Sequence, residues 1–177
     1  MIQTTEKKTG NAVKTALSMM LGASIGLSPA AGAATITANV AAIISGSIAA
    51  TASTGLSFGD VSPGVTAGAV TIDTAGFRSS IGGVTLGMST PASPAIFQVT
   101  GTPSSTYVVT SPSSLSLANG SGNFMTVDSF TSNPSGAAGL LDAGGTQTLS
   151  VGGTLHVGAN QPGGTYSGVL AMTIVYY

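Results

Sequence analysis

The sequence predicts an all-β protein, folded as an antiparallel β-sandwich. Beyond residue 33, apolar residues recur at every second position in short runs, which is typical of strands with one buried face. Clusters of Gly, Pro, Asn and Ser separate these runs and predict turns. No run after residue 33 has the period of a good amphipathic helix. Many short strands at this spacing favour a sandwich in one domain.

The first segment has the three parts of a secretory signal peptide. Residues 1–14, "MIQTTEKKTGNAVK", contain three lysines, and residues 15–27, "TALSMMLGASIGL", are uncharged and largely apolar. "SPAAGA" follows and places Ala31 and Ala33 in the small-x-small pattern that signal peptidase reads. The apolar run is too short for a helix that spans a bilayer.

We therefore expect a signal peptide over residues 1–33 and a mature chain that begins at Ala34. Cleavage after Ala30 is the second choice, and a retained membrane anchor is the alternative. A cleaved leader predicts export through the periplasm to the cell surface.

Cleavage would remove all three lysines and leave a weakly charged chain. The charged residues that remain would be Arg78 and four aspartates, Asp60, Asp73, Asp128 and Asp142. One basic residue cannot neutralise a phosphate backbone, so nucleic acid is excluded as a partner. The chain also lacks a polybasic patch for anionic lipid and contains no cysteine for a disulfide. Stability must therefore come from the core or from a partner.

The segment 34–50 predicts an N-terminal extension and the start of the first strand. Its alanines favour helix, but its β-branched residues and its two-residue period favour strand. We expect two strand segments, hinged near residues 41–46. One face carries the residues that we assign to a donor strand, a strand that completes a partner's sheet: Ile36, Ala38, Val40, Ala42, Ile44 and Ile48.

The same pattern predicts further strands along the chain. They are Leu56–Phe58, Ala69–Ile72, Val84–Met88, Ile96–Thr100, Tyr107–Thr110, Ser114–Leu117, Phe124–Phe130, Thr146–Val157 and Thr165–Tyr177. The turns between them are predicted at "SPG", "TAG", "GG", "TPS", "SPS", "NGSG", "NPSG", "AGG" and "QPGG". The sequence shows no convincing internal repeat or second domain.

Residues that could support catalysis or metal binding are scarce. The single histidine, His156, lies between Leu155 and Val157, which take the inward face, so we expect its side chain to point to solvent. Four scattered aspartates are a poor metal site. Asp73 and Arg78 flank a turn and could form an exposed ion pair there. The sequence thus predicts no enzyme and no catalytic, cofactor-binding or metal-binding residue.

The chain ends on one of its strongest strand patterns, "GTYSGVLAMTIVYY". Chain ends are usually frayed unless something ties them down. This segment resembles the closing strand of chaperone–usher pilins, which has an aromatic residue in the penultimate position and a glycine fourteen residues from the end. Tyr176 and Gly164 hold these two places. The alternating face is Gly164, Tyr166, Gly168, Leu170, Met172, Ile174 and Tyr176.

The rest of the mature chain carries a second resemblance. "LSFGDVSPG", "FQVTG", "MTVDSFTSNPSG" and "QTLSVGGTLHVGANQPGGTYSG" are similar to a family of small secreted bacterial domains of unassigned function, regarded as pilin-like. The sequence departs from classical pilins because it lacks their cysteine pair. Its front end is also not cleanly divided into a donor segment and a first strand.

The resemblance implies an immunoglobulin-like sandwich over residues 51–177 that lacks its last strand. In such pilins a groove beside the C-terminal strand is filled first by a periplasmic chaperone. At the outer-membrane usher, the N-terminal extension of the next subunit replaces the chaperone. The implied partners are therefore identical subunits, a chaperone and an usher, with no nucleic acid and no small-molecule cofactor.

The function that this resemblance implies is a structural subunit of an extracellular fimbria, serving surface adhesion or biofilm formation. An alternative is a secreted, spore-coat-like sandwich at the cell surface whose front segment completes its own fold. A third hypothesis is a tip adhesin, but that role normally needs an added receptor-binding domain.

Overall fold

A computed structural model of the chain describes residues 34–44, 48–135 and 139–177. The expected signal peptide lies outside these residues, as do residues 45–46 of the expected hinge, whereas residues 41–44 continue the first strand without a break. The described part confirms the all-β prediction, and none of its residues form a helix of the length and apolarity needed to cross a membrane. The strands are β1 (Ala34–Ile44), β2 (Ala49–Thr54), β3 (Leu56–Ile72), β4 (Arg78–Leu86), β5 (Ala95–Thr100), β6 (Thr106–Thr110), β7 (Ser114–Ala118), β8 (Phe124–Asn133), β9 (Gly139–Leu140), β10 (Thr146–Val157) and β11 (Tyr166–Tyr176).

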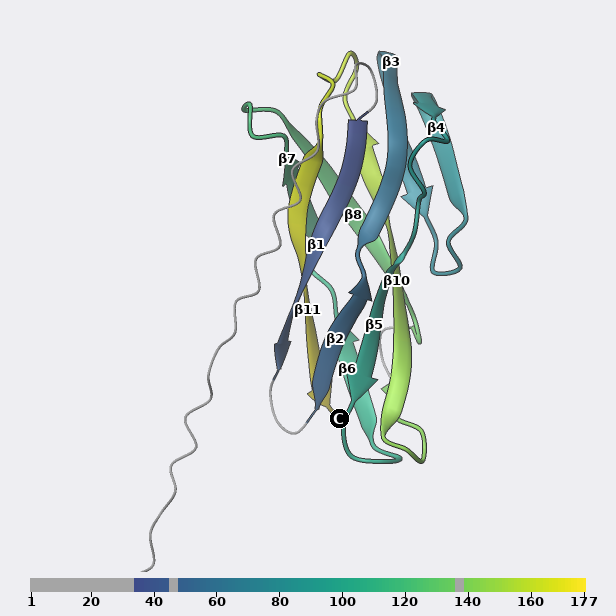
Figure 1. Cartoon of the computed structure of the whole chain (residues 1–177), viewed down its shortest axis with the longest axis vertical. Coiled ribbons are helices and arrows are strands. Elements are labelled where there is room, and N and C mark those ends of the chain that lie inside the picture. Colours follow the sequence, from purple (N-terminus) through teal and green to yellow (C-terminus); the bar gives the residue numbers. More distant parts are fainter. Residues whose placement is uncertain (1–33, 45–47, 136–138) are drawn as a thin grey trace, which may run out of the picture.

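Six strands pair in succession and close into a ring. Their order is β1, β3, β10, β8, β7 and β11, and β11 returns to β1 (Figure 1). The other strands branch from this ring: β4 pairs with β3, β5 and β2 extend from β10, and β6 and β9 extend from β11. Because β1 is one member of the ring, the closure depends on the most N-terminal described segment.

The direction of one strand pair differs from the prediction of a fully antiparallel sandwich. β1 and β11 run parallel, whereas the other strand pairs among the described residues are antiparallel. An alternating pattern looks the same read in either direction, so the sequence contains no signal for this choice. Parallel strands also require a long connection between them, and here the remainder of the domain supplies it.

The expected division of the N-terminal segment into two strands is confirmed. β1 pairs with the start of β3 as far as Ala38, opposite Leu56, whereas β2 pairs with β5. Gly55 separates β2 from β3, and a Cβ atom there would lie 2.9 Å from the carbonyl oxygen of Ala38. A glycine at this position therefore lets β1 approach the point where the two segments diverge.

The hydrophobic core lies inside the ring and between the branching strands. It contains one large cluster in which both aromatic and aliphatic side chains are almost fully buried. Its largest members are Tyr107, Tyr166, Phe58, Phe97, Ile36, Ile48, Leu56, Ile72, Leu117, Leu141, Leu149 and Leu155. The core thus joins residues of β1 and β11 with residues from most of the chain, so the first and the last described strands meet in it.

The longest strand was predicted as two strands, and this prediction is wrong. "SPG" at 62–64 lies within β3, which runs without interruption from Leu56 to Ile72. "GG" at 82–83 likewise lies within β4, although Gly82 has a φ of 74°. The two strands pair on either side of an irregularity between Pro63 and Gly68. These residues therefore bend a strand pair and do not end it, which is the common role of glycine at a bulge.

Other strand assignments also differ from the prediction, most clearly at β4 and β9. β4 begins at Arg78, not at Val84, and β9 was not predicted. β9 has only two residues, which pair with Thr106 and Tyr107 of β6. So short a strand has no detectable period, and a distant partner defines it.

Arg78 does not form the ion pair with Asp73 that the sequence allowed. Its guanidinium donates hydrogen bonds to the backbone carbonyls of Phe58 (2.9 Å), Asp60 (3.3 Å) and Gly87. The Asp73 carboxylate instead accepts two backbone N–H groups of its own turn. Arg78 thus joins β3, β4 and the loop after β4, and no sequence pattern indicates these distant carbonyls.

Asp60, beside this cluster, is the buried charged residue among the described residues. Among the hydrogen bonds to its carboxylate, that of the Thr90 hydroxyl has the largest effect on its pKa, followed by the Thr90 backbone N–H, which donates at 2.7 Å, and by Ser89. These hydrogen bonds outweigh desolvation and hold the pKa of Asp60 below its ordinary value. The folded-state pKa is therefore below the unfolded one, so this stabilisation is present above the unfolded pKa and is lost as the pH falls through the folded pKa.

We expect Arg78→Met to lower the free energy of unfolding by about 2–5 kcal/mol, because it leaves three carbonyl acceptors without their charged donor. Arg78→Lys should fall between Met and wild type, since one ammonium group cannot reproduce the planar fork of donors. Urea unfolding of the three proteins measures this order. Equal stabilities would show that the guanidinium contributes nothing.

Candidate functional site

The groove between β11 and β3, filled by β1, is the candidate functional site. Along one edge, β1 forms nine residue pairs with β11, from Ile36–Tyr166 to Ile44–Ile174. Along its other edge, it forms five pairs with the start of β3. Figure 1 shows β1 lying between the yellow β11 and the blue β3. The N-terminal segment therefore lies beside β11 of its own chain, whereas the prediction placed it as a donor strand in the groove of a neighbouring copy.

The donor-strand face was predicted from a two-residue period. The side chains of Ile36 and Ala38 are 1% and 2% exposed, and Ala42 is partly buried. Ala41, on the opposite face of the strand, is exposed. Val40 and Ile44 lie opposite Leu170 and Ile174 in the register; their side chains are outside the described set.

Ile48 is buried but does not belong to β1, contrary to the single face that was predicted. It directly precedes β2, which pairs with β5 and not with β11. The strand that fills the groove is therefore β1 alone, which ends at Ile44.

The residues predicted to form the wall of the groove are buried at some positions and partly exposed at others. Tyr166, Leu170, Met172 and Ile174 of β11 are nearly fully buried. Gly168 of the same face is partly exposed, and a Cβ atom there would lie 2.6 Å from the carbonyl oxygen of Ser116. Glycine at this position therefore allows β11 to approach β7 closely.

Gly164 and Tyr176 lie at the ends of the predicted face. Gly164 precedes β11 and has a φ of 146°, so it belongs to the turn that leads into the strand. Tyr176 ends the strand, and its hydroxyl accepts a 2.6 Å hydrogen bond from the backbone N–H of Thr102. The penultimate aromatic residue thus fixes the end of β11 to the loop after β5.

A second tyrosine fixes the other end of β11. The Tyr166 hydroxyl donates to the carbonyl oxygen of Pro162 at 2.7 Å and accepts from the Gln161 side-chain amide at 3.0 Å. The same amide also donates to the Phe124 carbonyl of β8. Sequence reasoning missed Thr102, Gln161 and Pro162, because a hydroxyl's partner in another loop leaves no periodic signal.

On its other edge, β11 pairs with β7 at Ser167–Ala118 and with β6 over residues 173–176. Both edges are therefore occupied while β1 is in place. Removal of β1 would expose the β11 edge along residues 166–174, together with the apolar side chains beneath β1. An open edge of this kind promotes association with another strand.

His156 points outward, as the sequence predicted, and its side chain is 52% exposed. Its Nε2 atom lies 2.9 Å from a carboxylate oxygen of Asp128, and this contact lowers the pKa of Asp128. No group of three metal-binding side chains occurs in the described part of the chain. An exposed ion pair of this kind contributes little to the free energy of unfolding.

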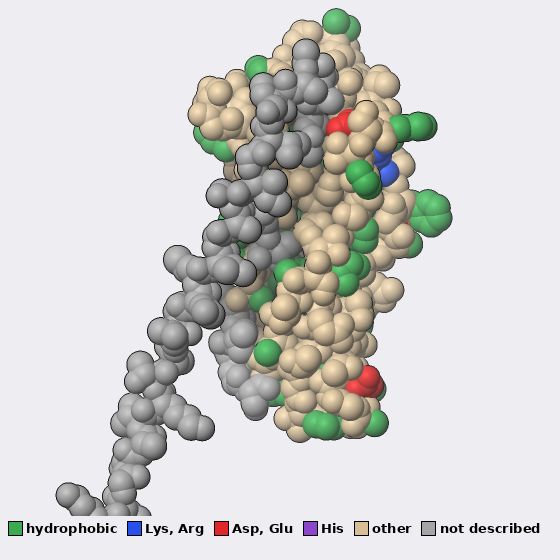
Figure 2. All heavy atoms as spheres, in the orientation of Figure 1, with side chains coloured by type: hydrophobic (Ala, Val, Ile, Leu, Met, Phe, Trp, Pro, Cys, Tyr) green, Lys and Arg blue, Asp and Glu red, His purple; other side chains and the backbone are tan. Residues whose placement is uncertain are grey.

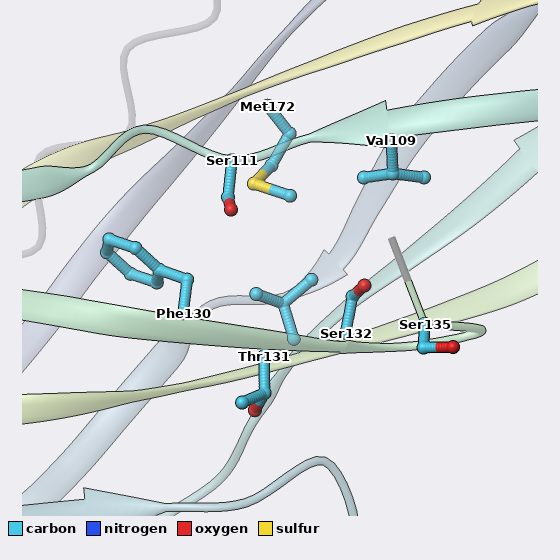
Figure 3. A pocket seen from close by; sticks show the side chains of 8 residues that line it. Val109, Ser111, Phe130, Thr131, Ser132, Ser135 and Met172 are labelled. Atoms are coloured by element: carbon cyan, nitrogen blue, oxygen red, sulfur yellow. The ribbon is translucent and has the colours of Figure 1, made fainter. Parts of the chain in front are cut away.

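A cavity of about 280 Å³ opens between β6 and β8 (Figure 3). Its lining combines hydroxyl and apolar side chains: Val109, Ser111, Phe130, Thr131, Ser132, Ser135, Val151 and Met172. None of these lining residues is an acid, a histidine or a lysine, so the cavity offers no general acid or base. It is an opening between strands, lined by hydroxyl and apolar groups.

Residues 47–176 match a family described as a domain of unknown function, DUF4402. The chain belongs to the DUF4402 family. The matched DUF4402 residues include β2 to β11, whereas β1 lies before them. No curated protein is significantly similar to the chain. The DUF4402 domain and the strand that fills its groove are thus separate along the sequence.

The Tyr176 hydroxyl contact generates a prediction with a close control. Tyr176→Phe should lower the free energy of unfolding by about 0.5–1.5 kcal/mol, the usual value of one hydrogen bond, because the Thr102 N–H loses its acceptor. Tyr177→Phe alters a neighbouring tyrosine that is 92% exposed and should leave stability unchanged. Chemical denaturation of both variants checks the difference. Equal losses would contradict an anchoring role for Tyr176.

Proposed function

We propose that this protein is the repeating structural subunit of an extracellular fimbria, assembled by donor-strand exchange. In the fibre, β1 of one copy fills the groove between β11 and β3 of the next copy. The fibre serves adhesion to surfaces or biofilm formation. The observation that carries this proposal is the position of β1, the first described strand, which lies between two strands of the domain, β11 and β3.

The energetics of the groove support an obligatory occupant. Burial of Ile36 alone contributes about 1.5–3 kcal/mol, and each ladder hydrogen bond adds about 0.5–1.5 kcal/mol. Association of separate chains costs on the order of 4–15 kcal/mol, so a strand of β1's length is needed for a tight contact. A head-to-tail contact of this type does not close on itself and therefore builds a filament.

Two further observations support an exchangeable strand. β1 lies outside the DUF4402 match, and its connection to β2 spans only residues 45–48. A terminal element on one short connection is the type of element that identical chains exchange. The weakly charged mature sequence and the absence of cysteine are compatible with a subunit whose stability comes from its neighbours.

The route of assembly rests on the resemblance of the C-terminal strand to that of chaperone–usher pilins. A signal peptide would deliver the chain to the periplasm, where a chaperone would cover the groove. An outer-membrane usher would then exchange the chaperone for the next subunit. This route gives the exposed β11 edge a partner at every stage, which an aggregation-prone edge requires.

One observation favours a second candidate, a secreted β-sandwich of the cell surface that completes itself and stays monomeric. In the structure, β1 fills the groove of its own chain in the parallel direction. If this arrangement persists at the cell surface, the closed single chain is the functional form. The two candidates differ in which chain supplies β1.

The fibre proposal is tested by two substitutions of the same chemical type in β1. Ala38 is buried in the groove and Ala41 is exposed. Ala38→Asp should abolish filaments, because an unpaired carboxylate in an apolar core costs several kcal/mol. Ala41→Asp introduces the same charge toward solvent and should retain them. Electron microscopy of material from the cell surface, beside wild type, provides the comparison.

Filaments from both variants alike would rule out β1 as the joining strand. A wild-type protein that stays monomeric at the cell surface would support the self-completed candidate instead. In that case Ala38→Asp should only destabilise the monomer, which a thermal unfolding measurement would show.

A further inference from the structure

The cavity between β6 and β8 exists because two consecutive strands have different partners. β7 pairs with β8 over residues 124–128, whereas β6 pairs with the end of β11. Beyond residue 128, β8 continues to Asn133 beside β10. The second half of β8 therefore lies apart from β6, and a space of about 280 Å³ opens between them. β1 pairs with the other edge of β11, so this space is separate from the groove of the proposed fibre contact.

The side chains around the cavity are mostly apolar. Phe130 of β8 is partly buried and lies on one side, and Val109 and Met172 extend toward β8 from the other side, as Figure 3 shows. The fully buried Val151 of β10 completes the apolar part of the lining. An aromatic ring and a thioether sulfur both form favourable contacts with the ring of an aromatic guest.

One hydroxyl in the lining is available to a guest. The Ser111 hydroxyl, just after β6, has no hydrogen-bond partner among the residues that the structure describes, and Figure 3 shows it directed toward β8. The Ser132 hydroxyl, by contrast, donates to the carbonyl oxygen of Pro134 at 2.9 Å. Thr131 and Ser135 belong to the exposed surface. A guest inside the cavity therefore meets one hydroxyl that can bond to it.

Charge and polarity restrict the chemistry of that guest. The lining contains no acidic or basic side chain, so a charged guest would lose its hydration without gaining a counter-ion. Figure 2 also shows few acidic or basic side chains on the face in view, so little charge is present there to attract an ion. A sugar would bring several hydroxyls to one available hydroxyl and leave the others unsatisfied. An apolar ring with a single hydroxyl matches the lining.

We propose that this cavity binds one uncharged phenolic ring. The ring lies against Phe130 and the Met172 sulfur, and its hydroxyl bonds to the Ser111 hydroxyl. An engineered cavity of about 150 Å³ holds benzene, so about 280 Å³ accommodates one ring with a small substituent. The ring belongs either to a free phenol or to a tyrosine side chain of a partner protein, which present the same chemistry. This binding goes beyond the fibre function and does not depend on it.

Methionine resonances provide a direct measurement. After residue 33, methionine occurs only as Met88, Met125 and Met172. In the exported chain with carbon-13-labelled methionine methyl groups, 4-methylphenol should shift the Met172 resonance to saturation at about millimolar concentration, through the ring current. Met88 is 97% exposed and Met125 does not line the cavity, so their resonances should stay in place. The absence of a saturable shift at Met172, or equal shifts of all three, would overturn the proposal.

Two substitutions at Ser111 test the position of the ring. Ser111→Phe should fill the cavity with the protein's own ring and abolish the Met172 shift, whereas Ser113→Phe adds the same ring at an exposed position of the same loop and should retain it. Ser111→Ala leaves the cavity open. It should weaken binding of 4-methylphenol by about 2–10-fold, the value of one hydrogen bond, and leave binding of toluene unchanged. Undiminished binding of 4-methylphenol by both Ser111 variants would overturn the proposal.

Two further compounds identify the source of the ring. A Met172 shift with N-acetyltyrosinamide would support a tyrosine side chain of a partner protein, and a response to 4-methylphenol alone would support a free phenol. Methyl glucoside should give no shift. A response to the glucoside without a response to either phenol would overturn the assignment. All these measurements use the monomer with β1 in its own groove, so their outcome is independent of whether the chain forms fibres.

Discussion

The edge of β11 is the constraint on which the rest of the structure depends. This strand carries a nearly continuous buried face, and its backbone needs partners on both sides. β6 and β7 occupy one edge, and β1 occupies the other along nine residue pairs. Without β1, the ring of strands opens and the core is exposed between β11 and β3. The strong alternating pattern of residues 166–176 is therefore explained: β11 forms one wall of the groove that β1 fills.

The contacts in the groove require a strand with the sequence of β1, but they do not determine which copy of the chain supplies it. The contacts made by Ile36 and Ala38 depend on the strand, and the connection over residues 45–48 decides whether that strand belongs to the same copy. Within one chain, the effective concentration of β1 is set by this connection. Between chains, it depends on how closely an assembly process places them. A head-to-tail fibre thus requires that the groove be kept open, or reopened, until the next copy arrives.

Sequence reasoning reached the parts of this site that depend on period two. It identified β1 and the buried face of β11 because alternation marks one face of a strand. It could not give the direction of β1, since alternation has no direction. It misplaced Ile48 because the chain leaves the groove without a break in the pattern, and it divided β3 at "SPG" because a turn and a bulge use the same residues. The partners of Arg78 and Tyr176 are backbone groups far away in sequence, which composition and spacing do not specify.

The most direct test of the central claim is to determine which chain supplies β1 in assembled material. A benzophenone amino acid at position 41, which faces solvent beside Ala171 of β11, would be photo-cross-linked in fibres grown from a mixture of normal and heavy-isotope-labelled subunits. The account predicts a ladder of joined chains on a denaturing gel. Mass spectrometry of these products should show position 41 of one isotopic form attached to β11 of the other. Cross-links confined to single chains, with one monomer band, would contradict it.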